Sequence, residues 1–189
     1  MWASGRPSPY ADRRPTPSTA PTIVPTPGPD QVLLEGSLGV ANVTAGDTKY
    51  VVGVAADAGQ VLKFQVYFNN LEPDDSNKVA RDVTVRLALS GTAPEFRMNM
   101  TVKGGNTAEV ASSAIVEVPA AMTLTYLRGS AVWRHNTGSS DSPHWVDTPI
   151  SDDVMGSGYN VGDVQPHFTT AGTVSVLMRV ESPSNQSAS

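Results

Sequence analysis

Two stretches of sequence decide the fold class of this chain: Gln60-Val-Leu-Lys-Phe-Gln-Val-Tyr-Phe-Asn-Asn70 and Arg81-Asp-Val-Thr-Val-Arg-Leu-Ala-Leu89. In each of them apolar and polar residues alternate, so that one face of an extended strand is apolar and the other is polar. The apolar positions are Leu62, Phe64, Val66 and Phe68 in the first stretch and Val83, Val85, Leu87 and Leu89 in the second. This pattern is typical of half-buried antiparallel strands.

Similar strand signals, separated by Gly, Pro, Asn and Asp, continue along the chain after Asp30. They predict strands at residues 31–35, 37–44, 48–55, 60–69, 80–89, 96–103, 107–118, 122–127, 129–135 and 172–181. No window has a convincing helical period, and the strand-favouring residues Val and Thr dominate. The sequence therefore predicts an all-β protein, a two-layer antiparallel β-sandwich.

The first 30 residues differ in composition from the rest. Pro, Ser, Thr, Ala and Gly prevail there, with prolines at positions 7, 9, 15, 17, 21, 25, 27 and 29. Because proline removes ladder donors and favours polyproline II, we expect an extended arm or linker. Such an arm is either disordered or docked on a neighbouring subunit. The side chains expected to anchor a docked arm are Trp2, Tyr10, Ile23 and Val24.

The expected division of the chain is therefore an arm at 1–30, one β-sandwich domain at 31–182 and a flexible tail at 183–189. The formal net charge is −5, and the 13 Lys and Arg are scattered, which argues against a nucleic-acid partner. The absence of Cys excludes disulfides and Cys-ligated zinc. No apolar run approaches the roughly 20 residues that a membrane helix needs, so we expect no membrane insertion.

The first 30 residues also contain no hydrophobic segment of the kind found in classical secretion signals. Three explanations stay open. The chain is a trimmed part of a secreted protein, is exported by another route, or is a virion component assembled in the cytoplasm.

Three segments resemble the immunoglobulin-like conserved repeat modules of bacterial and archaeal surface proteins. They are Gly59-Gln-Val-Leu-Lys-Phe-Gln-Val-Tyr-Phe-Asn69, the expected partner strand Ala80-Arg-Asp-Val-Thr-Val-Arg-Leu87, and a closing block, Val161-Gly-Asp-Val-Gln-Pro166 with Ala171-Gly-Thr-Val-Ser-Val-Leu-Met-Arg-Val180. The likeness extends from Gly59 to Val180, although the middle, from Ala93 to Pro143, is longer than the family pattern. It implies an immunoglobulin-like antiparallel β-sandwich, here with an extended Pro-rich N-terminal arm, and a structural or adhesive role.

Two loops attract attention as candidate sites. The first offers the oxygen ligands that calcium prefers, from Asn69, Glu72, Asp74 and Asp75, without the regular spacing of an EF-hand. A solvated polar turn and a structural calcium ion are both open interpretations, and we expect no other cofactor. The second is the long polar connection from Asn136 to Ala171. Its aromatic residues Trp145 and Tyr159 are expected to act as pegs into the core edge or as a platform that binds sugars.

Catalytic patterns are missing from the sequence, which predicts that the protein is not an enzyme. There is no Gly-x-Ser-x-Gly elbow and no pair of carboxylates on strands. The three histidines, His135, His144 and His167, lack a paired spacing on one strand face and are interpreted as ordinary loop histidines.

These observations favour a non-enzymatic structural subunit of a cell-surface or extracellular assembly, such as a fibre, pilus or surface layer. In this hypothesis the protein self-associates, and the arm links neighbouring copies. Two alternatives stay open. One is a phage virion decoration or minor structural protein with virion proteins as neighbours, and the other is a carbohydrate-binding or adhesive module.

Overall fold

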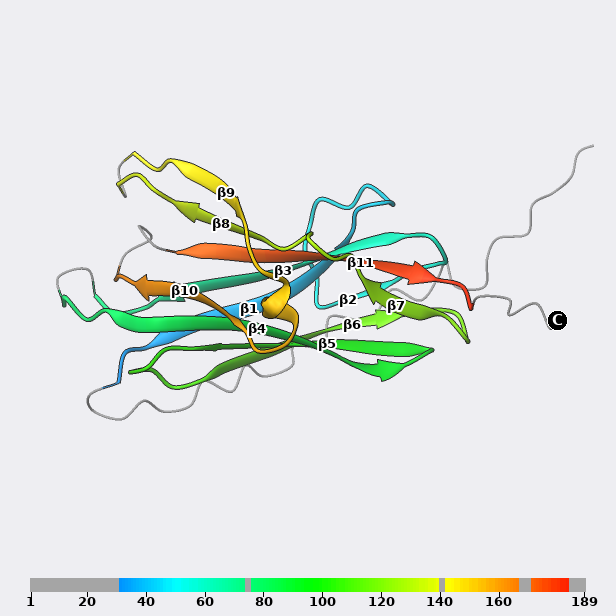
Figure 1. Ribbon diagram of the computed structural model, residues 1–189, viewed down its shortest axis with the longest axis horizontal. Coiled ribbons are helices and arrows are strands. Elements are labelled where there is room, and N and C mark those ends of the chain that lie inside the picture. The colour runs from blue at the N-terminus through cyan, green and yellow to red at the C-terminus, as the bar shows by residue number, and fades with distance from the viewer. Residues whose placement is uncertain (1–30, 74–75, 140–141, 167–170, 184–189) are drawn as a thin grey trace, which may run out of the picture.

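The protein is a sandwich of two β-sheets, shown in Figure 1 by a computed structural model that describes residues 31–73, 76–139, 142–166 and 171–183. The strands of the first sheet are β1 (Leu34–Asn42), β3 (Val61–Asn70), β7 (Thr123–Tyr126), β8 (Val132–Asn136), β9 (Trp145–Pro149) and β11 (Gly172–Glu181). The strands of the second sheet are β2 (Gly53–Ala55), β4 (Ala80–Thr92), β5 (Glu95–Lys103), β6 (Val110–Glu117) and β10 (Tyr159–Val164). One 3-10 turn, η1 (Asp152–Met155), precedes β10.

The two sheets are named here after β3 and β4, the strands that contain the two alternating stretches. The β3 sheet has the order β1-β3-β11-β8-β9, with β7 pairing to β11 as well, and the β4 sheet has the order β10-β4-β5-β6-β2. All pairings between these strands are antiparallel except that of β2 with β6. The all-β sandwich predicted from the alternating sequence is thus confirmed. The described part of the chain contains no helix long and apolar enough to cross a membrane.

The core is built from the two alternating stretches that were recognised in the sequence. The inward side chains of β3 and β4 are fully buried at Leu62, Phe64, Val66, Phe68, Val83, Val85 and Leu87. The expectation that β4 is the partner strand of β3 is wrong, because the two strands lie in opposite sheets. An alternating sequence indicates only that one face of a strand is buried. That face packs against the opposite sheet, so the pattern does not identify the strand that lies beside it.

Strand β3 is flanked by the strands nearest to the two ends of the described chain. It pairs with β1 from Leu34↔Asn70 to Asn42↔Leu62 and with β11 from Gly172↔Phe68 to Arg179↔Val61. Both neighbours are antiparallel to β3, so β1 and β11 run parallel to each other. The chain therefore enters the β3 sheet at one end of β3 and leaves it at the other end (Figure 1).

Strand β1 is continuous where the sequence predicted a break between two short strands. Gly36 lies within it, near its start, and faces the other sheet: a Cβ added there would be 3.3 Å from Met100 Cε and 3.4 Å from Val110 Cγ1. The glycine allows the sheets to approach closely and does not end the strand.

The strand predicted at 48–55 is largely replaced by a segment that crosses between the sheets, which we call the edge strap (residues 50–55). Val51 exchanges two backbone hydrogen bonds with Val40 of β1, at N···O distances of 2.8 and 3.0 Å. Next, the Val52 carbonyl accepts a bond from the Ile115 amide, and β2 continues alongside β6. The edge strap therefore lies along one edge of each sheet.

The prediction that residues 136–171 form only a polar connection is wrong, since β9, η1 and β10 lie within it. None of the β9 residues is buried, so its sequence has no apolar face to detect. In β10 the register shifts on both sides of Gly162, which has φ of +85°. This bulge breaks the period of two, and Val161 and Val164 are both buried although they are three positions apart.

Candidate functional site

The outward face of the β3 sheet carries rows of side chains that cross β1, β3, β11, β8 and β9. Pairing places one row at Ser37, Tyr67, Thr173, Arg134 and Asp147. The next row is Gly39, Gln65, Ser175, Val132 and Pro149. Residues paired across neighbouring strands lie close enough to act together on one ligand.

Two hollows on this face share a boundary and form what we call the outer groove. One, with a volume of about 380 Å³, lies over β3, β11, β8 and β9 and includes Lys63, Arg134 and Trp145 in its lining. The other, with a volume of about 390 Å³, lies between β1, β3 and the edge strap. Tyr50, Gln65 and Thr173 line both hollows. The outer groove therefore extends from β9 across β8, β11, β3 and β1 to the edge strap.

Apolar side chains stay exposed along this groove. Tyr50 is 39% exposed and Trp145 is 44% exposed, and the strap residues Val51 and Val52 are exposed to a similar degree. Tyr50 contacts the sheet where β1 has Gly39, since a Cβ at that position would be only 2.7 Å from Tyr50 Cβ. The missing side chain of Gly39 thus lets the edge strap lie against the sheet.

Polar groups of both charges lie between these apolar side chains. Arg134 Nε is 3.9 Å from Asp147 Oδ1, a loose and solvated ion pair that leaves both groups available. The side chains of Lys63 and Gln65 have no hydrogen-bond partner among the described residues. Burial, followed by the nearby Glu35 carboxylate, raises the pKa of Tyr67. The groove can therefore bind a ligand through both ring contacts and hydrogen bonds.

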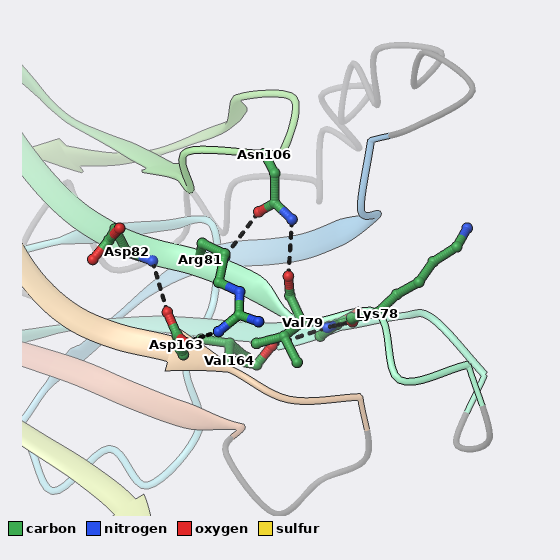
Figure 2. Close-up of polar contacts among 8 residues, drawn as sticks. Lys78, Val79, Arg81, Asp82, Asn106, Asp163 and Val164 are labelled. Carbon is green, nitrogen blue, oxygen red and sulfur yellow. Dashed lines mark hydrogen bonds and ion pairs between the residues drawn. The ribbon is translucent and has the colours of Figure 1, made fainter.

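A second cluster of polar residues lies at one end of the sandwich (Figure 2). The Arg81 guanidinium donates to Asp163 Oδ2 at 2.6 Å, and the Asp82 amide donates to Asp163 Oδ1 at 3.1 Å. Asn106 accepts from the Arg81 amide and donates to the Val79 carbonyl. The Asp82 amide and then Arg81 lower the pKa of Asp163. These bonds tie the turn between β5 and β6, the start of β4 and the end of β10 together, so the cluster serves the fold.

The buried side chain of Asn70 completes this end of the sandwich. Its amide nitrogen donates to the carbonyls of Lys78 and Val164 at 2.8 and 2.9 Å, and its oxygen accepts from the Glu72 amide at 3.0 Å. Asn70 therefore links the segment that connects β3 to β4 with the end of β10.

The calcium site predicted in the segment between β3 and β4 is only partly within the described residues. Asp74 and Asp75 lie outside them, so the site stays a prediction. Glu72 already accepts from the Leu33 amide at 3.1 Å and pairs with Lys78 at 3.3 Å. The Asn69 amide nitrogen is 3.4 Å from a Glu35 oxygen. Among the described residues, no three His, Asp or Glu side chains are grouped so that they could hold a metal ion.

The two aromatic residues expected to form a platform lie in different sheets. Trp145 begins β9 and lines the outer groove. Tyr159 begins β10, pairs with Val85 and packs half-buried against the core. The aromatic side chains that join Trp145 on the groove are instead Tyr50 and the less exposed Tyr67. The sequence analysis did not single them out because their segments resembled ordinary strands. The expected arm anchors Trp2, Tyr10, Ile23 and Val24 lie outside the described residues.

The histidines have separate surroundings. The ring of His135 stacks on Trp133, with centroids 3.9 Å apart and planes inclined by 21°. His144 Nδ1 is 2.9 Å from the Thr137 hydroxyl, and His167 lies outside the described residues.

One further polar contact is structural. The Tyr126 hydroxyl donates to Asp152 Oδ1 at 2.5 Å, and the Gly129 amide donates to the same oxygen at 2.9 Å. Burial, followed by this hydrogen bond, raises the pKa of Tyr126 to about 12. The contact fastens η1 to the turn that follows β7.

Comparison of the chain with protein-family models, with curated proteins and with solved structures found no match.

Proposed function

We propose that this protein is a non-enzymatic structural subunit of a cell-surface or extracellular assembly, such as a fibre, pilus or surface layer, in which the N-terminal arm links neighbouring copies. The observation that carries the proposal is the outer groove. The inward face of the β3 sheet is used for the core, whereas the outward face leaves Tyr50, Val51, Val52 and Trp145 exposed. Exposed apolar side chains gathered along a groove and bordered by polar groups are typical of interaction surfaces.

The backbone of β9 favours association through this face rather than through the sheet edge. The Thr137 amide donates to the His144 carbonyl, so the ladder bonds of the hairpin fall on alternate residues. The backbone groups of Trp145, Asp147 and Pro149 consequently point to the free edge. Proline has no donor to offer there, and a charged residue opposes stacking of a further strand. Edge pairing at β9 is therefore disfavoured.

The length of the arm suits a link between copies. An extended polyproline chain rises by about 3.1 Å per residue, so 30 residues span up to roughly 90 Å. Contacts between an arm and a different surface of the next copy are heterologous, and repeated heterologous contacts build open filaments. This supports a fibre or layer.

Deletion of residues 1–29 tests the proposal. The buried core begins at Val32 and ends at Val180, so the shortened chain should fold as a monomer that no longer assembles. Light scattering and negative-stain electron microscopy would compare it with the full chain over a range of concentrations. Circular dichroism and thermal melting would verify that the fold is retained. Unaltered assembly after the deletion would contradict the proposal.

A carbohydrate-binding module is the second candidate, favoured by one observation. Trp145 has an exposed ring beside Arg134, Asp147 and Gln65, which are planar groups able to form paired hydrogen bonds with hydroxyls. Binding of the full chain to a glycan array, lost in Trp145→Ala, would support this candidate. The absence of binding to any glycan on the array would contradict this candidate.

A further inference from the structure

We propose that the outer groove is the receptor for the Pro-rich arm, residues 1–30, of a second copy of this chain, with the arm seated between Tyr50 and Trp145. The inference rests on the proposed function, since it assumes that the arm links copies, and it adds where the arm binds.

The chemistry of the groove suits a polyproline segment. Such segments bind grooves lined by aromatic side chains, and their preformed conformation reduces the entropy lost on binding. Trp145 supplies an exposed ring in one hollow, and Tyr50 supplies a second ring where the two hollows meet. A polyproline helix has no internal hydrogen bonds, so its carbonyls need external donors. Lys63, Gln65 and Thr173 supply such donors on the groove floor.

The sequence of the arm offers side chains that suit both the aromatic residues of the groove and the valines of the edge strap. Pro15-Thr-Pro17 and Pro25-Thr-Pro27 offer proline rings, and Ile23 with Val24 offers an apolar pair for the valines of the edge strap. The arm carries three arginines and two aspartates, whereas the whole chain has a net charge of −5. The arm is thus slightly basic and the rest of the chain acidic, which favours the encounter of the arm with another copy. The groove lining itself, with Lys63, Arg134 and Asp147, adds no net attraction for a basic segment.

The way in which the chain enters the sandwich favours binding between copies. The Val32 amide donates to the Asn106 carbonyl at 3.0 Å, and Val32 forms a parallel bridge with Thr107. Both partners belong to the turn between β5 and β6 of the opposite sheet. The chain therefore approaches β1 along the β4 sheet, whereas the outer groove lies on the far face of the β3 sheet. An arm leaving from this point meets the groove of a neighbour more readily than its own.

The absence of cysteine from the chain allows a direct test by crosslinking. Full-length Ile23→Cys, labelled with ¹⁵N, would be mixed with unlabelled full-length Thr173→Cys under mild oxidation. Mass spectrometry would then count disulfides that join labelled to unlabelled chains. The matched control is Thr101→Cys, since Thr101 is also a half-buried threonine on the outward face of its sheet. Docking raises the local concentration of the arm, so we expect at least about tenfold more crosslinking to position 173 than to position 101.

A second pair of variants tests whether the aromatic lining of the groove is responsible for the crosslink. Trp145→Ala, introduced into the Thr173→Cys chain, should reduce the disulfide to the level of the control and weaken assembly of the full chain. Leu71→Ala should leave both unchanged, because Leu71 is equally exposed at 44% but lies outside the outer groove. Thermal melting would confirm that both variants fold.

The outcomes separate this inference from the proposed function. Equal crosslinking to positions 173 and 101, in a chain whose assembly still requires the arm, would overturn the groove as receptor and leave the structural role standing. Disulfides found only within one chain of an Ile23→Cys, Thr173→Cys double variant would show that the arm folds back, which would also overturn the inference. Glycan binding that depends on Trp145, without any crosslink, would assign the groove to a sugar instead. Assembly that persists without residues 1–29 would contradict the proposed function itself.

Discussion

Tyr50 lies against Gly39 so closely that a methyl group on the glycine would be 2.7 Å from Tyr50 Cβ. The two residues belong to different parts of the sheet edge, the glycine to β1 and the tyrosine to the edge strap. Their contact places an aromatic ring between the two hollows of the outer groove. The shape of the groove therefore depends on the absence of a side chain at one position.

Gly39→Ala should displace the edge strap and destabilise the fold by about 1–3 kcal/mol, as is usual for an overpacked site. Denaturant unfolding would measure the loss, and Tyr50 should become more exposed. Gly53→Ala is the control, because the nearest atom to its added Cβ is at an ordinary 3.6 Å. An equal effect of both substitutions would show that the close contact with Tyr50 is not the cause.

Phe64→Ala should reduce the free energy of unfolding by about 3–5 kcal/mol, since a large buried ring is replaced by a cavity. Phe64 is 0% exposed in the middle of β3. Its neighbour Lys63 points to the outer groove, so Lys63→Ala should change the stability by less than about 0.5 kcal/mol. Urea unfolding of both variants would check the assignment of the two faces, and similar small effects would refute it.

Asn70→Ala should destabilise the protein by about 2–4 kcal/mol, because it leaves two carbonyls and one amide without their partner. The adjacent Asn69→Ala removes only one long contact and an oxygen that has no partner among the described residues. It should therefore have a much smaller effect. Chemical unfolding of the two variants side by side would compare neighbouring buried amides, and the reverse order would contradict the role given to Asn70.

The hydroxyl of Tyr126 should make stability depend on alkaline pH. Its pKa is raised from 10.0 to about 12, so between these values the unfolded chain loses a proton that the folded chain keeps. The contribution is therefore complete below pH 10 and is lost as the pH rises toward 12. Melting temperatures from pH 9 to 11.5 should fall less steeply for Tyr126→Phe than for the unmodified chain. Parallel curves would mean that this tyrosine does not contribute.

The alternating stretches could be predicted from sequence because both faces of each strand are defined by their surroundings. Phe64 faces a core and Lys63 faces solvent, and such a contrast is visible in the residues themselves. Which strands are neighbours is a different matter. Nothing in the pattern of β3 or β4 reveals that the chain changes sheet between them. A strand buries its apolar face in the core whether the next strand in sequence pairs with it or lies in the opposite sheet, so both arrangements give the same pattern.

The candidate site was harder to predict for the same reason. Trp145 stood out as an aromatic residue in a polar region, but its neighbours on the groove come from β3, β8, β11 and the edge strap. Their proximity depends on strand order. Tyr50 was missed because its position over Gly39 arises from a contact between residues of different strands.

The arrangement of β1 and β11 on either side of β3 has a mechanical consequence. Tension applied to the two ends of the domain would pull β1 and β11 in opposite directions along β3. The ladder hydrogen bonds lie across this direction, so they would be loaded together in shear instead of opening one after another. A sandwich stretched between these two ends would therefore resist force best along the direction of β3.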